Sequence, residues 1–187
     1  LRVEEVDGIP FMKLKTVPMN IWNRFLKRSF DLVVSFFILI LLAPIMIVIG
    51  ILVKSTSKGP LFYEQERVGL DGQKFMMLKF RSMLVDAEQS GPQMASRNDD
   101  RYTPIGKTLR KFSLDELPQF INVLAGHMSI VGPRPEREFF INSMKETIHR
   151  YLERHRVKCG ITGWAQVNGA RGTDSSMQTR IDYDIYY

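Results

Sequence analysis

The sequence predicts an α+β fold that is mainly helical and is held in a membrane. Three features predict it: an apolar run at 32–53, two short strand-like runs joined by Asp71-Gly72, and several stretches with helical apolar periodicity. We therefore expect a membrane-embedded re-entrant helix-break-helix, then a small β-hairpin, then several amphipathic helices at the membrane surface.

The apolar run has 22 residues from Leu32 to Val53, and Ser35 carries its only polar side chain. As a straight helix it would reach about 33 Å, enough to cross a hydrocarbon core of about 30 Å. Pro44 removes a backbone donor near the middle and is expected to break the helix after Ala43. The arm before the break would be about 18 Å long, which is too short to span a bilayer.

Positive charge lies at both ends of this run. The basic residues are Arg24, Lys27 and Arg28 before it, and Lys54 and Lys58 after it. Because Lys and Arg collect on the cytoplasmic side of a membrane, both ends are most simply placed on the same face. This favours a re-entrant segment, and a spanning helix and a buried core helix stay open as alternatives.

The chain is divided into three parts by composition. Residues 1–20 are expected to be the tail of a preceding domain or a linker, 21–58 an interfacial lead-in with the membrane helix, and 59–187 a folded domain truncated at its C-terminus. The net charge is 26 − 20 = +6, and the single cysteine, Cys159, excludes a scaffold held by intrachain disulfides. The basic residues interleave with apolar faces, so nucleic acid is not expected as a partner.

The folded domain shows a hairpin signal and three helical stretches. Asp71-Gly72 lies between the runs at 61–63 and 75–80 and predicts a β-hairpin. The expected helices are one capped by Thr103 with Pro104 at its first position and a buried stripe of Ile105, Leu109 and Phe112, one from about Glu116 to Leu124 that stops near Gly126, and one from Arg137 to Lys158. Residues 86–100 and 160–172 are expected to be loops.

The densest group of reactive side chains lies in 110–118. Two carboxylates, Asp115 and Glu116, are adjacent between a basic helix end and a new helix start. A capping box from Ser113 to Glu116 would place Pro118 where a backbone donor is needed, so Asp115 is the expected N-cap. A carboxylate at a helix N-terminus stays ionised and can attack a phosphorus atom.

Attack on a phosphate needs cations that offset the repulsion between negative charges. The candidates are Arg110, Lys79, Arg81 and Arg134. Glu116, together with Asp115, could hold a magnesium ion. The sequence contains no Walker-type or dinucleotide-binding glycine motif and no Cys/His cluster with the spacing of a zinc site.

Several motifs follow one another along the chain in a specific order and spacing. They are Lys27-Arg28-x-x-Asp31, Gln65-x-Arg67-x-Gly69, Lys79-Phe80-Arg81-Ser82-Met83, Ser113-Leu114-Asp115-Glu116-Leu117-Pro118-Gln119, Asn122-Val123-Leu124, Met128-Ser129-x-Val131-Gly132-Pro133-Arg134-Pro135 and Gly160-Ile161-Thr162-Gly163-Trp164-Ala165-Gln166-Val167-Asn168-Gly169. Through these motifs the chain resembles the monotopic phosphoglycosyl transferases, bacterial sugar transferases, over residues 24–187. Residues 1–20 resemble the end of the extra N-terminal region in the long undecaprenyl-phosphate members.

The resemblance implies transfer of sugar-1-phosphate from a UDP-sugar, glucose or galactose being the expected sugars, to undecaprenyl phosphate with release of UMP. It implies magnesium, a covalent phosphosugar intermediate on Asp115 with Glu116 as its partner, and a place in the first step of exopolysaccharide, capsule or O-antigen assembly. Arg110, Lys79 or Arg81, and Arg134 fall on the phosphate-binding positions. Residues implied to bind substrate or support the fold are Gln65, Arg67, Gln166, Asn168 and Arg171.

The resemblance also implies a place in the bacterial inner membrane, with the active site on the cytoplasmic face, membrane lipids as neighbours and a homo-oligomer as one expected assembly. Three residues depart from the family pattern: Ala43 replaces a Ser before Pro44, His127 replaces an Asp, and Cys159 replaces a Pro. Two other functions fit the same residues. One is a non-catalytic membrane-bound module of a polysaccharide assembly complex, and the other is a lipid-phosphate hydrolase.

Overall fold

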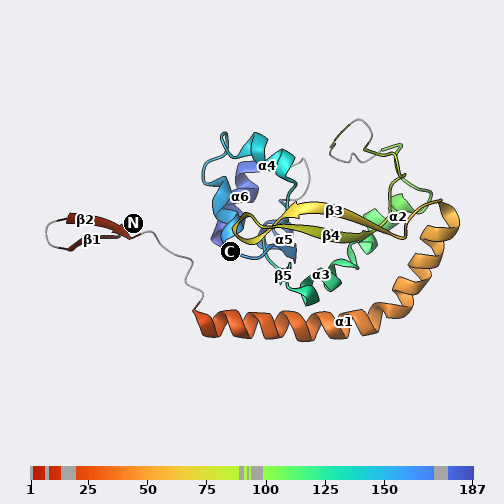
Figure 1. The fold of residues 1–187 in the computed structure, drawn as a ribbon, viewed down its shortest axis with the longest axis horizontal. Helices are drawn as coiled ribbons and strands as arrows, with labels where there is room; N and C mark the ends of the chain where they lie inside the picture. Colours follow the sequence, from red (N-terminus) through yellow and green to blue (C-terminus); the bar gives the residue numbers. More distant parts are fainter. Residues whose placement is uncertain are drawn as a thin grey trace.

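The computed structural model describes residues 2–6, 9–13, 20–88, 91, 93, 99–170 and 177–187. Strands β1 (Arg2–Val6) and β2 (Ile9–Lys13) pair antiparallel, so part of the expected tail forms a hairpin. The fold of the remaining described residues is mainly helical with small two-stranded sheets, as predicted (Figure 1). Most of the expected loop at 86–100 lies outside the described residues.

Helix α1 (Ile21–Thr56) is one continuous helix of 36 residues. It begins at Asn20, whose side-chain oxygen accepts a 2.8 Å hydrogen bond from the backbone of Asn23. The expected break is wrong: the helix continues through Pro44, and its C-terminal part bends toward the hairpin (Figure 1). Within the described chain, α1 is the helix long and apolar enough to cross a membrane, and only 11% of its most apolar window is buried.

Polar contacts attach the N-terminal half of α1 to the folded domain. The Arg28 guanidinium donates hydrogen bonds of 2.6 and 2.9 Å to the carbonyls of Val123 and Leu124, at the C-terminal end of a helix. The buried Asp31 carboxylate accepts from the Ser129 hydroxyl at 2.8 Å and from the backbone N–H of Ile130 at 3.1 Å. The motif from Lys27 to Asp31 is therefore a structural attachment.

Apolar packing attaches the C-terminal half of α1. Ile49 and Val53 are buried against Phe80 and Leu109. Both ends of the apolar run thus contact the same folded domain.

The β-hairpin forms as predicted. Strands β3 (Phe62–Val68) and β4 (Lys74–Phe80) pair antiparallel, with Phe62 opposite Phe80. The turn η1 (Leu70–Gly72) needs left-handed backbone at Asp71 (φ 51°) and Gly72 (φ 76°), conformations that Asp and Gly tolerate well. Phe75 and Met77 of β4 reach the core that also holds Val123 and Met128.

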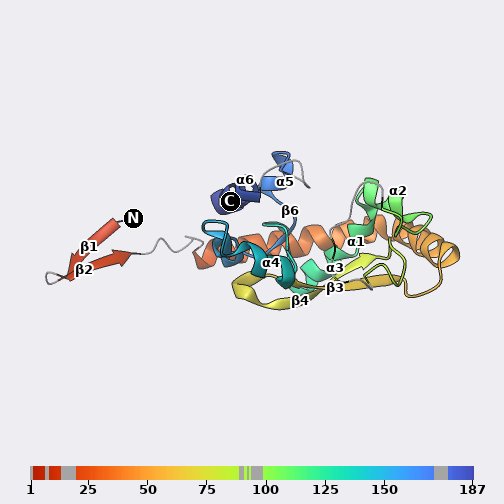
Figure 2. The same cartoon turned by 90° about the horizontal axis from the view of Figure 1, so that it is seen from above.

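The rest of the domain consists of short elements. They are α2 (Gly106–Lys111), η2 (Leu114–Glu116), α3 (Gln119–Ala125), β5 (Ser129–Val131), α4 (Glu138–Met144), η3 (Tyr151–Arg156), β6 (Gly160–Thr162), α5 (Trp164–Val167) and α6 (Met177–Tyr186). Strands β5 and β6 pair parallel. Seen from above, α5 and α6 lie on one side of α1 and the β3–β4 hairpin lies on the other (Figure 2).

Three expectations for these elements need correction. Helix α2 begins at Gly106, because the Thr103 hydroxyl donates to the Ser82 carbonyl at 3.4 Å and does not cap the helix. Phe112 is 63% exposed and is not part of a buried stripe, although Leu109 is. The expected loop at 160–172 contains β6 and α5.

The expected helix from Arg137 to Lys158 is also wrong. Helix α4 ends at Met144, and Arg150 takes left-handed backbone (φ 60°) before η3 starts. This change of direction lets Tyr151 pack with Val68, Ile141 and other apolar side chains of a buried cluster. Helical periodicity read along the sequence does not reveal such a turn.

Candidate active site

The two adjacent carboxylates lie in η2, a single 3₁₀ turn between α2 and α3. Ser113 precedes the turn with left-handed backbone (φ 57°), and Pro118 directly precedes α3. Asp115 is inside η2, so its prediction as an N-cap is wrong. The predicted end of α3 is confirmed: Gly126 has φ 90° and donates its N–H to the Val123 carbonyl.

Glu116 is held by two cations from different elements. Its Oε1 accepts from Lys79 Nζ of β4 at 2.9 Å and from Arg134 Nη2 of the Pro-rich turn at 2.7 Å. Burial opposes ionisation, but Arg134 and Lys79 lower the pKa of the Glu116 carboxyl well below its usual range. Burial in turn lowers the pKa of the Lys79 ammonium, although Glu116 opposes that shift. Glu116 therefore stays charged and fixes both cations.

Asp115 differs from its neighbour. Its side chain is buried, with 5% of the residue exposed, and burial raises the pKa of its carboxyl while Lys79 and Arg110 oppose the rise. This direction is opposite to the one expected for a helix N-cap. Among the ion pairs of the described residues none involves Asp115. The site therefore contains a carboxylate that lies near cations but is not paired with one.

Arg110 adds a third cation near this carboxylate. It is exposed on α2, its guanidinium lies 5.4 Å from the centre of the Tyr102 ring, and its charge opposes the rise in the pKa of Asp115 that burial causes. The structure thus brings Lys79, Arg110 and Arg134 together around Asp115 and Glu116.

Arg81 takes a different position from the one expected. Its guanidinium is buried and donates to the carbonyls of Ser57 at 2.7 Å and Lys58 at 2.9 Å, at the end of α1. It thereby satisfies the carbonyls of the two residues that directly follow α1. We therefore leave Arg81 out of the proposed phosphate-binding set.

Two further arginines, Arg67 and Arg154, donate hydrogen bonds to backbone carbonyls of the turn that carries Arg134. Arg67 donates to the Pro135 carbonyl at 3.1 Å, and Gln65 accepts from Arg67 at 3.0 Å. Arg154 donates to the Arg134 carbonyl at 2.8 Å and forms a 2.7 Å ion pair with Asp184 of α6. Gln65 and Arg67 thus act as support.

Arg154 and Asp184 were missed by the sequence reasoning. Their side chains are 1% and 2% exposed, so they form a fully buried ion pair. The two residues lie 30 positions apart, with β6 and α5 between them, and only the tertiary fold pairs them. The only signal in the sequence is a charged residue within a stretch of helical apolar periodicity.

Glycines allow the backbone of this turn to pack closely. A Cβ at Gly132 would lie 2.2 Å from the Lys158 carbonyl oxygen, and one at Gly160 would lie 2.1 Å from the Gly132 nitrogen. No side chain fits between these two backbones, so the turn lies directly on β6.

The remaining candidate residues are not brought to the carboxylates by any described contact. Gln166 donates to the Ile161 carbonyl at 3.4 Å and Asn168 to the Trp164 carbonyl at 2.9 Å. Arg171 lies outside the described residues. Cys159 packs in the core, where burial raises the pKa of its thiol to about 12 and makes it unreactive.

The side chains fit magnesium only in part. Within the described part of the chain, no group of three or more His, Cys, Asp or Glu side chains could hold a metal ion. The Asp115 carboxylate fits a magnesium ion that takes its other ligands from water and phosphate. Glu116 does not fit, because both of its oxygens face cations.

Comparison with known proteins decides the family. The profile described as "Bacterial sugar transferase" matches residues 22–187. The chain belongs to this family. It is 49% identical to a UDP-glucose:undecaprenyl-phosphate glucose-1-phosphate transferase from Klebsiella pneumoniae and 46% identical to one from Escherichia coli K12, with 100% of the chain and 41% of each relative covered.

A third relative differs in the sugar that its name gives. It is a UDP-N-acetylgalactosamine-undecaprenyl-phosphate N-acetylgalactosaminephosphotransferase from Aeromonas hydrophila, 42% identical over 87% of the chain and 39% of the relative. The chain thus spans about two fifths of the length of these curated relatives.

Proposed function

We propose that this chain is the catalytic region of an undecaprenyl-phosphate sugar-1-phosphate transferase that takes its sugar phosphate from a UDP-hexose. UDP-glucose is the first donor to test, because the relatives with 49% and 46% identity carry it in their names. The observation that carries the proposal is the unpaired, buried Asp115 carboxylate among three cations. The reaction would begin exopolysaccharide, capsule or O-antigen assembly.

The chemistry consists of two displacements at one phosphorus atom. An Asp115 oxygen attacks the phosphorus that carries the sugar, and the bond from that phosphorus to the bridging oxygen breaks, so that UMP leaves with the electron pair. An oxygen of undecaprenyl phosphate then attacks the same phosphorus. The bond to Asp115 breaks, which restores the carboxylate and gives undecaprenyl-diphosphate-sugar.

The cations make the first attack feasible. Lys79, Arg110 and Arg134 offset the negative charge that accumulates when a carboxylate approaches a diphosphate. Glu116 keeps Lys79 and Arg134 in place through its 2.9 and 2.7 Å contacts. Magnesium, when bound to Asp115 and the diphosphate, would supply further positive charge.

We propose that α1 is re-entrant and that its two ends face the cytoplasm. Arg28 attaches its first half, and Val53 its second half, to one folded domain. The middle exposes large apolar side chains, among them Leu41 at 74% and Ile51 at 63%. Residues 21–58 would then be the membrane part and 59–187 the catalytic part, placed at the cytoplasmic face of the inner membrane.

The proposal is tested by release of UMP from a panel of UDP-sugars, with Asp115→Asn compared with wild type and with Asp86→Asn, a change at an exposed position. We expect Asp115→Asn to abolish UMP release and Asp86→Asn to retain it. Wild-type rates in Asp115→Asn would refute the assignment. Inorganic phosphate instead of UMP would indicate a hydrolase, and no release with any sugar would indicate a non-catalytic module.

A further inference from the structure

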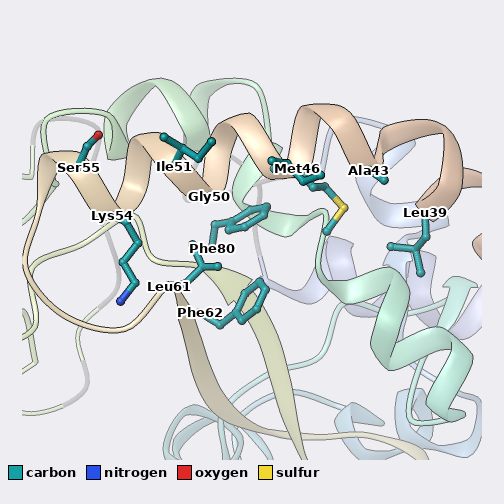
Figure 3. Close-up of a pocket in the computed structure, with 11 residues that line it drawn as sticks. Leu39, Ala43, Met46, Gly50, Ile51, Lys54, Ser55, Leu61, Phe62 and Phe80 are labelled. Atoms are coloured by element: carbon teal, nitrogen blue, oxygen red, sulfur yellow. The ribbon is translucent and has the colours of Figure 1, made fainter.

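An apolar groove lies between the C-terminal half of α1 and the base of the β3–β4 hairpin. Its volume is about 860 Å³. Figure 3 shows the residues that line it. Its walls include Ala43, Met46 and Gly50 of α1, and Leu61, Phe62 and Phe80 at the hairpin. All residues that line it are apolar except Lys54 and Ser55, which follow each other at one end of the lining face of α1.

Small residues of α1 leave this groove open. Ala43 and Gly50 are seven residues apart and therefore share one helix face. A Cβ added at Gly50 would lie 3.6 Å from Leu61, an ordinary contact, so a larger side chain there would extend into the groove. The rings of Phe62 and Phe80, stacked with centroids 5.5 Å apart, make the facing wall flat and apolar.

The groove and the turn that carries the two carboxylates share one apolar cluster. Met46 and Leu61 line the groove and pack against the buried cluster of Ile49, Val53, Phe80 and Leu109. Leu114 and Leu117, the residues on either side of the Asp115-Glu116 pair, pack against the same cluster. At the polar end, Lys54 follows Val53, whose side chain is fully buried in the same cluster.

Leu109 of α2 belongs to the same cluster, and the next residue along α2 is Arg110. Lys54 is exposed at the polar end of the groove, where its ammonium donates to the Gly59 carbonyl at 3.2 Å, so this end of the groove is cationic and suits a phosphate.

The chemistry of the lining selects the occupant. A nucleotide sugar is charged and hydroxylated, so contact with apolar walls does not stabilise it. A hydrocarbon chain is stabilised when it moves from water or from an exposed helix surface into an apolar groove. Ile47 and Ile51 line the groove yet are 64% and 63% exposed, so the groove opens onto the apolar surface of α1. A chain in the bilayer can therefore enter from the side, with its phosphate at the polar end.

We propose that this groove binds the isoprenoid chain of the acceptor, undecaprenyl phosphate, next to the phosphate that attacks the phosphosugar intermediate. The inference rests on the proposed function for the identity of the acceptor. It goes further by assigning the chain to one surface, formed by Ala43, Gly50 and the Phe62–Phe80 pair.

The test fills the groove in the full-length enzyme, reconstituted in nanodiscs. Ala43→Phe and Gly50→Leu add bulk inside it, and Val48→Phe is the matched control, because Val48 lies in the same stretch of α1, is 56% exposed and does not line the groove. Binding of radiolabelled undecaprenyl phosphate is measured directly, and the burst of UMP without acceptor is measured in parallel.

We expect both groove variants to raise the Kd for undecaprenyl phosphate by roughly tenfold, the scale of losing a few buried methylene contacts, with a normal UMP burst. The control should bind as wild type does. An unchanged Kd in both groove variants would overturn the proposal. If those variants also lost co-purifying phospholipid, the groove would bind bilayer lipid and not the acceptor.

The two measurements test the groove proposal and the proposed function independently of each other. A burst in the variants shows that they fold and react with donor, so a binding defect then belongs to the acceptor chain. A wild-type enzyme that gives no burst contradicts the proposed function, and the Kd comparison still decides the groove. Equal loss of binding in Val48→Phe would also contradict the proposal.

Discussion

Arg154 offers the sharpest test of how the fold supports its reactive residues. Its guanidinium pairs with Asp184 at 2.7 Å and donates to the Arg134 carbonyl at 2.8 Å. Arg154→Met keeps most of the side-chain volume and removes both contacts. Asp184 is then left buried without its cation.

The expected loss of stability follows from that burial. With 1% and 2% of the two side chains exposed, solvent screening is negligible. Removing one partner of a buried ion pair costs about 3–5 kcal/mol. For a chain of this size that corresponds to a fall in Tm of about 6–20 °C, at about 2–4 °C per kcal/mol.

The loss should also depend on pH. Burial raises the pKa of the Asp184 carboxyl, and Arg154 opposes the rise. Because the pKa of Asp184 is raised in the folded state, ionising the buried carboxyl costs free energy. The stability of the fold therefore falls as the pH rises through that pKa. Without Arg154 the pKa rises further, so the penalty should be larger at about pH 7 than at about pH 5.

The assay is thermal unfolding in detergent, with UMP release measured on the same samples. Arg154→Met combined with Asp184→Leu should recover most of the stability, since neither member of this pair then remains as an uncompensated buried charge. It should not recover the rate, because the donor to the Arg134 carbonyl is still absent. A single variant within about 1 kcal/mol of wild type would refute the reasoning, as would full activity in the double variant.

Three further predictions follow from the site and from α1. Glu116→Gln should lower kcat by about a hundredfold, because its two cations lose their anchor, and an unchanged kcat would contradict this role. The UMP burst should rise with pH as Asp115 ionises, at a pH above the ordinary aspartate pKa of 3.8. It should fall again as Lys79 loses its proton, at a pH below the ordinary lysine pKa of 10.5. A pH profile bounded by those two ordinary pKa values would argue against both shifts. Cysteines at the exposed Arg24 and Lys58 should react with impermeant reagent from the same side of the membrane, and labelling from opposite sides would indicate a spanning helix.

Features set by neighbours in sequence were predicted correctly. Asp71-Gly72 predicts the hairpin because its turn needs left-handed backbone that these two residues tolerate. Gly126 predicts the end of α3 for the same reason. In both cases a local conformational preference decides the structure.

Features set by distant contacts were not predictable in this way. Lys79 and Arg81 are two positions apart, but β4 ends at Phe80, so Arg81 leaves the sheet and turns to the end of α1. The turn at Arg150 is stabilised by packing that involves other elements. The sequence predicts Asp115 and Glu116 as site residues because two carboxylates are adjacent there. The pairing of Glu116 with Lys79 and Arg134, 37 and 18 positions away, comes from the tertiary fold.

The central claim is that an Asp115 oxygen receives the sugar phosphate. The most direct measurement is the intact mass of the purified protein after incubation with UDP-glucose and magnesium in the absence of acceptor, followed by addition of undecaprenyl phosphate. The account predicts an added mass of one hexose phosphate that maps to the peptide containing Asp115, is absent in Asp115→Asn, and disappears when acceptor is added. UMP release without such an adduct, or an adduct on another residue, would contradict it.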